Sequence, residues 1–355
     1  MRIAILLPSL KKKGPVILAF DLLLQLIDKV EVIDVFYFSD CADPYVLDPK
    51  HNVNFIKISF FTPYSFADYD ILHTHSFKPD FYSFLFKNNI KCLVITTVHN
   101  YVYEELFYTY NILISKLLSR IWMFSWRNKD SVVFLSRNME KYYKEKVSFR
   151  KNNIVIYNGR DVVLKSVNDQ NKHLIDSLLK IKDNFKLIGC CGFLNKRKGF
   201  EDVIKFLTLK SNLYAVFVGQ GPDEARLIEL AQSLNVIERC IFLGHQNNSI
   251  ALISLFDIFV MSSYSEGFPL VVLEAGGLNI PVLCVNSALF EELFSENEVV
   301  FYERNNLNSM TLSINKILNF GNDFSTNLNN TINAKYSCSI MADKYLKLFK
   351  ELNSY

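Results

Sequence analysis

The chain has 355 residues, of which 50% are hydrophobic, so it is long enough for two domains that each bury a sizeable core. Its apolar runs fall short of the roughly 18 to 20 residues that a membrane-spanning helix needs, and we expect no such helix. The net charge of +3 is small and no known reader motif is present, which argues against nucleic-acid binding.

Short β-rich runs alternate with helical patterns along the first half of the chain. Strands are predicted at residues 2–7, 30–36, 54–58, 71–73, 91–96, 131–135 and 153–156. Helices are predicted between them at residues 15–28, 78–87, 107–126 and 137–146. Strands that are separated by helices indicate βαβ units and a parallel sheet.

The alternation starts again after a turn signal at residues 158–161 and a polar segment that extends to residue 182. Strands are predicted at residues 185–191, 214–218, 240–243, 258–261 and 282–285. Helices are predicted at residues 200–210, 223–234, 250–255, 270–278 and 307–318. The predicted fold class is therefore α/β, with two parallel-sheet domains at residues 1–165 and 166–338. Ligands of such sheets bind beyond the carboxyl ends of the strands, so we expect a cleft between two facing domains.

Cysteine usage and charge distribution add two expectations. The seven cysteines are an odd number without CxxC spacing, which indicates free thiols in a reducing compartment, no zinc site and a cytoplasmic protein. Residues 1–160 hold 21 Lys/Arg and 15 Asp/Glu, a net charge of +6, which leaves 18 and 21, a net charge of −3, for the rest. An anionic partner is therefore expected at the first half.

Two glutamates, eight residues apart, mark the stretch that carries most information about function. Pro269 favours the start of a helix, and the apolar run from Leu270 continues it. Glu266 then lies in the loop before the helix, and Glu274 lies about one and a half turns inside it. Free backbone N–H groups and the positive end of the helix dipole lie between the two carboxylates, an arrangement that suits a phosphate.

Two glycine-containing loops at strand ends could complete an anion site. Lys196, Arg197 and Lys198 follow the strand that ends at residue 191, and three cations there suit a diphosphate leaving group. A solvated charged turn explains the same three residues about as well. Gly219 and Gly221 follow the next strand, where they would let a ligand approach the backbone, but an ordinary βα turn is the more frequent reading of such a pair.

Three histidines and a lysine-rich loop are the corresponding features of the first half. The loop before Gly14 contains three lysines and can approach a phosphate, although a lysine triplet is usually just solvated. His73, His75 and His99 lie at the ends of predicted strands, where a structural role is the default for each. A metal cluster of the three lacks a supporting carboxylate or cysteine pattern, and we expect no metal site.

The segment at residues 111–151 is strongly basic, with ten Lys/Arg and three Asp/Glu. A basic amphipathic surface with interleaved aromatic residues fits attachment to an anionic membrane. A solvated face over buried aromatic residues fits equally well. The basic residues that would form this membrane or acceptor face are Lys116, Arg120, Arg127, Arg137, Lys141 and Lys144.

Taken together, these motifs resemble glycosyltransferase family 4. The frame SxxEGFPLVVLEAGGLNIPV, preceded by GFLNKRKGFEDVI, FVGQGPDEARL, IFLGH and FDIFVMSS, is similar to the nucleotide-sugar domain of that family from about residue 186 to residue 294. The first half matches more loosely, through DILHTH, TVHN, SVVFLSRNM and VIYNGRD. The resemblance implies the GT-B fold, with a C-terminal helix at residues 339–352 that crosses back to the first domain, to which residues 339–355 would belong.

The resemblance also implies roles for individual residues. Glu274 would bind the donor ribose hydroxyls, and Glu266 the donor sugar near its reacting carbon. Lys198, with Arg197 nearby, would stabilise the leaving phosphates, and His99 would lie beside the donor sugar. The main-chain atoms expected to contact the donor belong to Gly14, Gly219, Gly244, His245, Gly267, Phe268, Pro269, Leu270 and Val271.

One residue departs from the family's pattern. Many members have arginine directly after the glycine at the end of the strand, where this chain has Phe193. Either Lys196 or Arg197 substitutes for that charge, or the leaving group is stabilised less. The family implies no bound metal or other cofactor, no covalent nucleophile, and retention by front-face attack in which the donor phosphate takes the acceptor proton.

The sequence therefore predicts a retaining enzyme that moves a hexose-type sugar from a nucleotide diphosphate sugar to a lipid-linked or growing surface-glycan acceptor. It would work in the cytoplasm, at the cytoplasmic face of a membrane. The alternatives are a non-catalytic nucleotide-sugar-binding protein, for which Phe193 is the hint, and a GT-B-like epimerase or phosphorylase. The sequence does not identify the sugar, the nucleotide, the acceptor or the oligomeric state.

Overall fold

The computed structural model describes residues 1–48, 51–108, 110–149, 151–164 and 169–354. The chain divides into two compact units: unit 1 comprises Met1–Gly159 with Tyr336–Tyr355, and unit 2 comprises Arg160–Lys335. The predicted boundary between residues 165 and 166 lies outside the described residues. Each unit is built on one parallel sheet, which confirms the α/β class predicted from the alternation of strands and helices.

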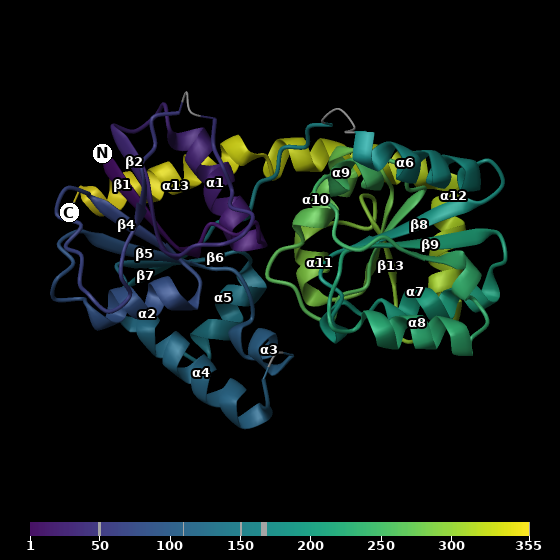
Figure 1. The fold of residues 1–355 in the computed structure, drawn as a ribbon, viewed down its shortest axis with the longest axis horizontal. Helices are drawn as coiled ribbons and strands as arrows, with labels where there is room; N and C mark the ends of the chain where they lie inside the picture. The colour runs from purple at the N-terminus through teal and green to yellow at the C-terminus, as the bar shows by residue number, and fades with distance from the viewer. Residues whose placement is uncertain (49–50, 109, 150, 165–168, 355) are drawn as a thin grey trace. The chain divides into compact units, whose positions relative to one another are not determined.

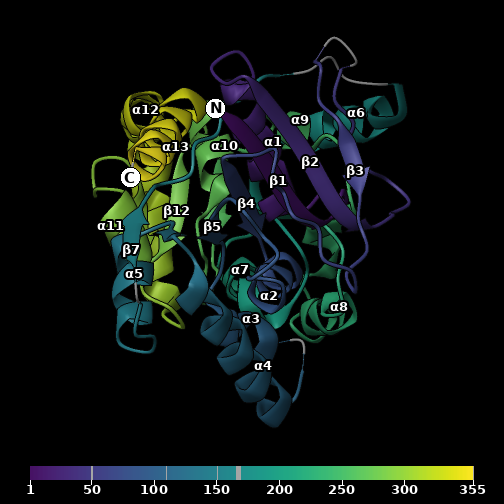
Figure 2. The same cartoon turned by 90° about the vertical axis from the view of Figure 1, so that its left-hand side faces the viewer.

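The sheet of unit 1 has seven strands in the order β3-β2-β1-β4-β5-β6-β7. Figure 2 shows β3, β2, β1 and β4 side by side. The chain places its first strand in the middle, adds β2 and β3 on one side, and then adds β4 to β7 on the other. The strands are β1 (Arg2–Ser9), β2 (Val32–Ser39), β3 (Phe55–Lys57), β4 (Ile71–His75), β5 (Leu93–Val98), β6 (Ser131–Phe134) and β7 (Asn152–Val155).

The central strand β1 is buried on both faces, which is typical of a parallel sheet covered by helices. Ile3, Ile5 and Leu7 belong to a core cluster with residues of α1 (Gly14–Leu26) and α13 (Cys338–Asn353). Ala4 and Leu6 point to the other face and belong to a second, aromatic-rich cluster. The ribbon shows α1 and α13 on one side of the sheet and α2 (Phe77–Leu85) on the other (Figure 1). The last helix of the chain therefore packs on unit 1, as the resemblance implied.

The region predicted as one helix at residues 107–126 differs in the structure. Its helix is α4 (Ile112–Ser125), which follows a short helix, α3 (Val102–Phe107), and precedes the 3-10 turn η1 (Trp126–Asn128). The side chain of Asn111 caps the new helix start by accepting a hydrogen bond from the Ile114 N–H at 3.0 Å. The predicted helix is therefore present and ends within a residue of residue 126, but it starts five residues later than predicted, because an apolar pattern alone does not reveal such a cap. The next helix, α5 (Arg137–Lys144), was predicted at residues 137–146.

A buried carboxylate, Asp80, fixes α4 and η1 to the sheet. Its Oδ1 accepts hydrogen bonds from the hydroxyls of Thr74 and Thr96, both at 2.6 Å. Its Oδ2 accepts from the indole N–H groups of Trp122 at 2.8 Å and Trp126 at 2.9 Å. Each oxygen is thereby satisfied twice, which makes a buried carboxylate tolerable.

A buried lysine accompanies this carboxylate. The Lys129 ammonium donates to the main-chain oxygen of Asp80 at 3.1 Å, and its side chain is 2% exposed. Burial lowers the pKa of Lys129 to about 8, although the charges of Asp80 and Asp130 oppose the shift. The ammonium thus bonds the main chain of Asp80 and the Ser83 hydroxyl rather than the carboxylate. The two buried charges still attract each other, so removal of the carboxylate charge leaves Lys129 less compensated.

We therefore predict that Asp80→Asn lowers the free energy of unfolding by about 1–3 kcal/mol, because an amide cannot accept from all four donors and leaves Lys129 less compensated. The double variant Asp80→Asn/Lys129→Met should lose less than Asp80→Asn alone, because no uncompensated charge remains. Urea unfolding followed by tryptophan fluorescence measures both. If the double variant lost as much unfolding free energy as Asp80→Asn, or more, the explanation by the buried Lys129 charge would be contradicted.

The sheet of unit 2 has six parallel strands in the order β10-β9-β8-β11-β12-β13. The chain again places its first strand centrally and extends the sheet first on one side and then on the other, as in unit 1. The strands are β8 (Lys186–Cys191), β9 (Leu213–Val218), β10 (Cys240–Phe242), β11 (Ile258–Met261), β12 (Val282–Val285) and β13 (Val300–Tyr302). The first five agree with the predicted runs to within a residue at each end, whereas β13 was not predicted.

Helices cover both faces of this sheet. The ribbon shows α7 (Glu201–Phe206) and α8 (Glu224–Ser233) on one side, and α9 (Ser249–Ile253) and α10 (Leu270–Gly277) on the other (Figure 1). The helix α12 (Leu307–Lys335) extends well past the predicted end at residue 318, with a kink at Phe320. The sequence also missed α6 (Asp169–Lys182), which replaces the expected polar segment, and α11 (Ala288–Leu293). Over the described ranges, none of the helices has both the length and the apolar character needed to cross a membrane.

Candidate functional site

The strand order of unit 2 shows where a ligand site should form. β8 and β11 are neighbours in the sheet, but the chain reaches β11 only after it has extended the other edge with β9 and β10. Ligands of open α/β sheets bind at such a switch point, outside the carboxyl ends of the two strands. The loops that leave these ends, residues 192–200 and 262–269, carry the cations and the first glutamate predicted from the sequence.

The structure brings Glu266, Lys198 and Arg197 together at this point. The Lys198 ammonium donates to Glu266 Oε1 at 2.6 Å, and Arg197 Nη1 lies 3.3 Å from Glu266 Oε2. Arg197 also donates to the main-chain oxygen of Ser265. Glu266 and Lys198 are each only 9% exposed, so the contacts form in a site largely shielded from water. These three residues are called the charge triad below.

The triad keeps Glu266 ionised. Burial alone would raise the pKa of the Glu266 carboxyl, but the positive charges of Lys198 and Arg197 outweigh burial and lower this pKa to about 2. The carboxylate is therefore negative at every pH at which an enzyme is normally assayed. One carboxylate between two cations leaves the triad with a net positive charge, which favours an anionic ligand.

The helix that follows Glu266 begins as predicted, but its first N–H groups are not all free. α10 starts at Leu270, directly after Pro269. The Leu270 N–H donates to the Phe268 carbonyl at 3.1 Å, and the Val272 N–H to the Pro269 carbonyl at 2.9 Å. Free backbone N–H groups were expected at this helix start. The Leu270 N–H is not free, because the tight turn after Gly267 gives it a local acceptor. The main-chain contact at Val271 stays a prediction.

Glu274 lies inside α10 and has a partner that the sequence did not suggest. Arg160 Nε donates to Glu274 Oε1 at 2.9 Å, and Arg160 Nη2 lies 2.9 Å from the same oxygen. Glu274 is 7% exposed, so Arg160 binds a nearly buried carboxylate. The pKa of the Cys191 thiol is raised to about 12, mainly by burial. The negative charge of Glu274 adds to this increase. Cys191, at the end of β8, therefore lies within electrostatic range of both Glu274 and the charge triad.

Three glycines bring the loops after β8, β9 and β10 into contact. The Gly219 N–H donates to the Gly244 carbonyl at 2.8 Å, and the Gly192 N–H to the Val218 carbonyl at 2.9 Å. Gly219 has φ +140°, and a Cβ at this position would lie 1.9 Å from the Gly192 carbonyl oxygen, so only glycine fits. Gly244 has φ +63° and open space where a Cβ would be, and the side chain of His245 beside it is exposed. The space beside Gly244 is thus open, although its carbonyl already accepts the Gly219 N–H.

Two predicted donor-site residues, Gly14 and His99, belong to unit 1. Gly14 is the first residue of α1 and has open space around it. The lysine loop before it is partly neutralised, because Lys12 pairs with Asp43 at 3.0 Å. His99 follows β5, and its Nε2 lies 2.9 Å from Nδ1 of His75.

The three strand-end histidines of unit 1, His73, His75 and His99, all have lowered pKa values. Burial lowers the pKa of His99 to about 3 and that of His75 well below its ordinary value. His73 lies in the core against Tyr345 and Phe349 of α13, and burial likewise lowers its pKa to about 3. His73 thus has the structural role that the sequence favoured. In the parts of the chain that the structure describes, no group of three or more His, Cys, Asp or Glu side chains is placed to hold a metal ion.

The predicted basic face is spread over separate elements. Lys116 and Arg120 are exposed on α4, whereas Arg127 lies in η1 with its guanidinium 5.1 Å from the ring centre of Phe124. Arg137, Lys141 and Lys144 lie on α5. Lys144 pairs with Glu140 at 2.8 Å, which reduces its contribution to a positive surface.

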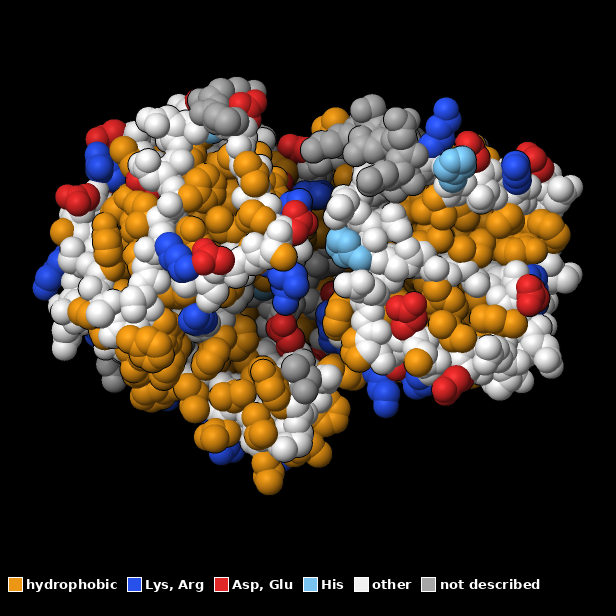
Figure 3. Space-filling model, in the orientation of Figure 1, with side chains coloured by type: hydrophobic (Ala, Val, Ile, Leu, Met, Phe, Trp, Pro, Cys, Tyr) orange, Lys and Arg blue, Asp and Glu red, His pale blue; other side chains and the backbone are white. Residues whose placement is uncertain are grey.

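Among its described residues, α4 buries small polar side chains and exposes apolar ones, the reverse of a typical surface helix. Its three buried residues are all serines, Ser115, Ser119 and Ser125. Leu113 is 79% exposed and Leu117 is 60% exposed. Figure 3 shows hydrophobic side chains gathered over α4. The exposed apolar side chains on this helix are Ile112, Leu113, Ile114, Leu117 and Phe124.

These features define what the site of unit 2 can do chemically. A shielded carboxylate and two cations lie at the switch point, next to a helix start and a second buried carboxylate. Cations at this place can neutralise the charge that develops on a leaving phosphate, and the carboxylates can accept hydrogen bonds from sugar hydroxyls. The triad and its neighbours therefore suit a ligand that combines phosphate and sugar groups.

Comparison with known families agrees with this geometry. Residues 171–334 match the family model described as "Glycosyl transferases group 1", and residues 25–164 match the model "Glycosyltransferase Family 4". An O-antigen biosynthesis glycosyltransferase of Escherichia coli, WclY, is 34% identical over 310 residues, which cover 86% of each chain. A Campylobacter jejuni 4-alpha-N-acetylgalactosaminyltransferase, whose name specifies a diphospho-undecaprenol-linked acceptor, is 30% identical over 167 residues, or 46% of this chain and 44% of that protein.

Solved structures show the same fold at low sequence identity. Sucrose-phosphate synthase from Thermosynechococcus elongatus superposes with a TM-score of 0.82 at 18% identity and covers 99% of both chains. HepE from Anabaena in complex with UDP-glucose superposes with a TM-score of 0.80 at 17% identity, covering 99% of this chain and 100% of that one. These similarities establish the two-sheet architecture of unit 1 and unit 2.

Proposed function

Because the chain belongs to glycosyltransferase family 4 and has the GT-B fold, we propose that it is a retaining enzyme that transfers a hexose-type sugar from a nucleotide diphosphate sugar. The observation that carries the proposal is the charge triad at the switch point of unit 2. Glu266 would contact the donor sugar near its reacting carbon, and Glu274 would bind the ribose hydroxyls. The UDP-glucose complex of HepE, a protein of the same fold, supports this class of donor.

The proposed reaction needs no covalent enzyme intermediate. The bond between C1 of the donor sugar and the diphosphate oxygen breaks, and a bond between C1 and the acceptor oxygen forms on the same face of the sugar. The acceptor hydroxyl proton passes to the departing phosphate oxygen. Lys198 and Arg197 would stabilise the negative charge that develops on the diphosphate, so that no metal ion is needed for this step.

The geometry favours Arg197 as the substitute for the arginine missing at position 193. Phe193 is 57% exposed, and Lys196 is exposed as well. The Arg197 guanidinium, in contrast, lies 3.3 Å from the Glu266 carboxylate and also binds the main-chain oxygen of Ser265. Arg197 therefore supplies a second cation within the charge triad. This weighs against a decayed, non-catalytic site.

The acceptor is proposed to be a lipid-linked or growing surface glycan at the cytoplasmic face of a membrane. WclY acts in O-antigen biosynthesis, and the Campylobacter relative is named for a diphospho-undecaprenol acceptor. In unit 1, α4 presents apolar side chains beside Lys116 and Arg120, as a helix at an anionic bilayer surface does. Unit 1 would thus contact the membrane that carries the acceptor.

A donor panel tests the proposed reaction. We expect the protein to release a nucleoside diphosphate from one of a set of UDP-, GDP- and dTDP-sugars when a bacterial lipid extract is added, with or without a chelator of divalent cations. Mass spectrometry of the lipid fraction should show one added hexose-type residue, and NMR should show that the anomeric configuration of the donor is retained. The Glu266→Gln variant serves as the inactive control.

Other outcomes have definite meanings. Tight nucleotide-sugar binding without release would identify a binding protein. Inversion at the anomeric carbon would overturn the retaining mechanism, and loss of activity with the chelator would overturn the metal-free step.

Membrane contact is tested by flotation with vesicles that contain either about 30% anionic lipid or none. We predict that wild-type protein floats with the anionic vesicles, and that Lys116→Glu/Arg120→Glu and Leu113→Ser/Leu117→Ser each reduce the bound fraction several-fold. The matched control reverses two exposed lysines of α13, Lys347 and Lys350. If the control reduces binding as much as the α4 variants, net charge rather than α4 determines the attachment.

A further inference from the structure

The loop that carries Glu266 has no regular secondary structure, although it places a carboxylate 2.6 Å from Lys198. β11 ends at Met261 and α10 begins at Leu270, and the residues between them form neither helix nor strand. A precise side-chain position on an irregular loop needs support from outside the loop. In unit 2 a large part of this support comes from Arg304, which follows β13.

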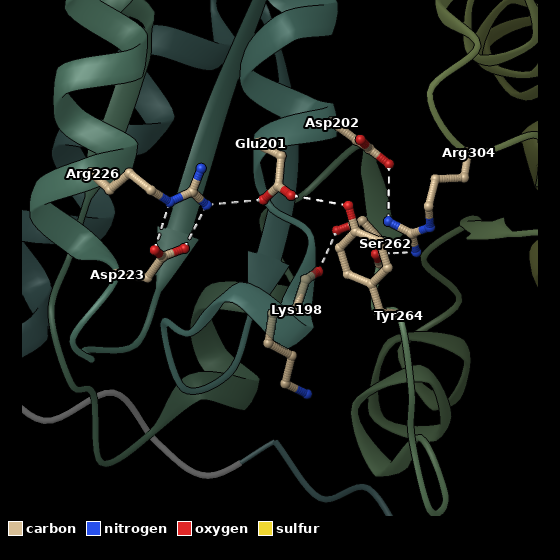
Figure 4. A network of polar contacts seen from close by, with 8 residues as sticks. All are labelled: Lys198, Glu201, Asp202, Asp223, Arg226, Ser262, Tyr264 and Arg304. Atoms are coloured by element: carbon tan, nitrogen blue, oxygen red, sulfur yellow. Dashed lines mark hydrogen bonds and ion pairs between the residues drawn. The ribbon is translucent and has the colours of Figure 1, made fainter. Parts of the chain in front are cut away.

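Arg304 binds the first three residues of this loop at once. Its Nη2 donates to the main-chain oxygens of Ser262 at 2.7 Å and Ser263 at 2.9 Å. Its guanidinium carbon lies 3.7 Å from the centre of the Tyr264 ring, a cation–π contact. Figure 4 shows the guanidinium between the Asp202 carboxylate and Ser262, with Tyr264 beside it. The planar fork of arginine suits such simultaneous contacts better than the single ammonium of lysine.

Arg304 is itself held in place by Asp202. Nη1 of Arg304 lies 3.3 Å from Asp202 Oδ2, and the Tyr302 hydroxyl donates to the same oxygen at 3.1 Å. Asp202 is 3% exposed and belongs to α7, the helix that follows the Lys198 loop. The guanidinium thus connects the Glu266 loop to the helix at the end of the Lys198 loop.

The two loops also touch each other where Arg304 binds. The Ser262 hydroxyl donates to the main-chain oxygen of Lys198 at 2.8 Å. Gly199 has φ +63°, and a Cβ there would lie 2.3 Å from the Ser262 oxygen and 2.8 Å from Arg304 Nη1. Figure 4 shows the Lys198 ammonium pointing away from these contacts. The network therefore fixes the main chain of Lys198, while the Lys198 ammonium remains bound to Glu266.

A second chain of contacts supports Tyr264 from the other direction. The Tyr264 hydroxyl donates to Glu201 at 3.2 Å, and Arg226 lies 3.2 Å from the other oxygen of Glu201. Arg226 in turn binds both oxygens of Asp223 at 2.6 Å (Figure 4). Tyr264 is thus held between Arg304 and Glu201.

We propose that Arg304 is a positioning residue of the candidate active site, which sets the distance between Glu266 and Lys198 through the Ser262 and Ser263 carbonyls. The inference rests on the proposed function of Glu266 and Lys198 in sugar transfer. Arg304 acts through the main chain of the loop. Its loss should therefore lower the turnover of bound donor more than it weakens donor binding.

The experiment compares Arg304→Ala and Arg304→Lys with a matched control, Arg239→Ala. Arg239 also donates to main-chain carbonyls of unit 2, those of Leu207, Lys210 and Leu213, none of which belongs to the Glu266 loop. Three quantities are measured: hydrogen exchange of a peptide that covers residues 262–269, thermal unfolding, and kcat and KM for the donor that the panel identifies.

For Arg304→Ala we expect faster exchange in this peptide and a kcat lower by roughly 10- to 100-fold, with the donor KM within about threefold of wild type. For Arg304→Lys, the exchange rate of the peptide and kcat should both lie between those of wild type and Arg304→Ala. Arg239→Ala should lower the unfolding temperature but leave kcat and the exchange of the peptide as in wild type.

Unchanged exchange of the 262–269 peptide in Arg304→Ala would overturn the proposal whatever the activity. An equal loss of kcat in Arg239→Ala would also overturn it, because general destabilisation would then explain the effect. If wild-type protein released no nucleotide from any donor, the proposed function would fail, and the exchange comparison would decide on the positioning of the loop by itself.

Discussion

Replacing Glu266 with glutamine is expected to lower the rate of sugar transfer by on the order of 10²- to 10³-fold while the protein stays folded. The change removes the only negative charge of the charge triad, which holds Lys198 at 2.6 Å and Arg197 at 3.3 Å from the two carboxylate oxygens. The glutamine oxygen can still accept a hydrogen bond from Lys198, while Arg197 keeps its bond to the main-chain oxygen of Ser265. Product formation and circular dichroism measure the two effects separately.

The same residue predicts a pH dependence of stability. The pKa of Glu266 lies at about 2 in the folded protein, below its ordinary value of 4.5. A carboxyl with a lowered folded-state pKa stabilises the fold above the unfolded pKa, and this contribution is lost as the pH falls toward the folded pKa. Between pH 5 and pH 2.5, wild-type protein should therefore lose more unfolding free energy than Glu266→Gln, by a few kcal/mol at most.

Glu266→Asp serves as the charge-conserving comparison. It keeps the negative charge and should keep most of the acid-labile stability, but it shortens the side chain and withdraws the carboxylate from the donor sugar. Full transfer activity in Glu266→Gln would remove Glu266 from the reaction. An identical acid profile in wild type and Glu266→Gln would mean that the triad does not hold the carboxylate ionised.

The parallel sheets could be predicted from the sequence because buried strands and amphipathic helices have different periods. The run at residues 258–261 became β11 with the predicted limits, since an apolar run between turn signals has few other structures available. β13 has only three residues, too few for a period to appear. The start of α4, five residues later than predicted, depends on the Asn111 side chain, and a hydrophobic pattern does not report a cap of this kind.

Contacts of the site could be predicted when the two residues are close in the sequence, but not when they are far apart. Glu266 and Glu274 share one loop-and-helix frame, so their proximity follows from local structure. Glu274 binds Arg160, 114 residues away, and no local pattern connects them. Arg304 follows an unpredicted strand and binds main-chain oxygens, which leave no signal in side-chain chemistry. The exposed face of α4 was likewise hidden, because its serines and its apolar residues both fit an amphipathic period and only packing decides which face is inside.

The three cations of the Lys196–Lys198 loop are expected to differ in importance in the order Lys198, Arg197, Lys196. Lys198→Ala should raise the barrier to transfer by about 2–4 kcal/mol, because a buried ammonium beside the leaving group acts in a shielded site. Arg197→Ala should cost less, since its guanidinium is shared between Glu266 and the Ser265 carbonyl. Lys196→Ala should stay within about twofold of wild type, as its side chain is exposed. kcat and kcat/KM with the identified donor give these differences directly.

The comparison of Arg197 with Lys196 decides how this chain functions with phenylalanine at position 193. If only Arg197→Ala lowers kcat, the cation has moved four residues along the loop, from the position that Phe193 occupies to one that contacts Glu266. An equal loss in Lys196→Ala would mean that the whole loop rearranges around the donor and that the contacts of Arg197 in the free protein do not predict its role. If neither change matters, Lys198 alone stabilises the leaving group, and Phe193→Arg should then raise kcat by adding a second cation at the carboxyl end of β8.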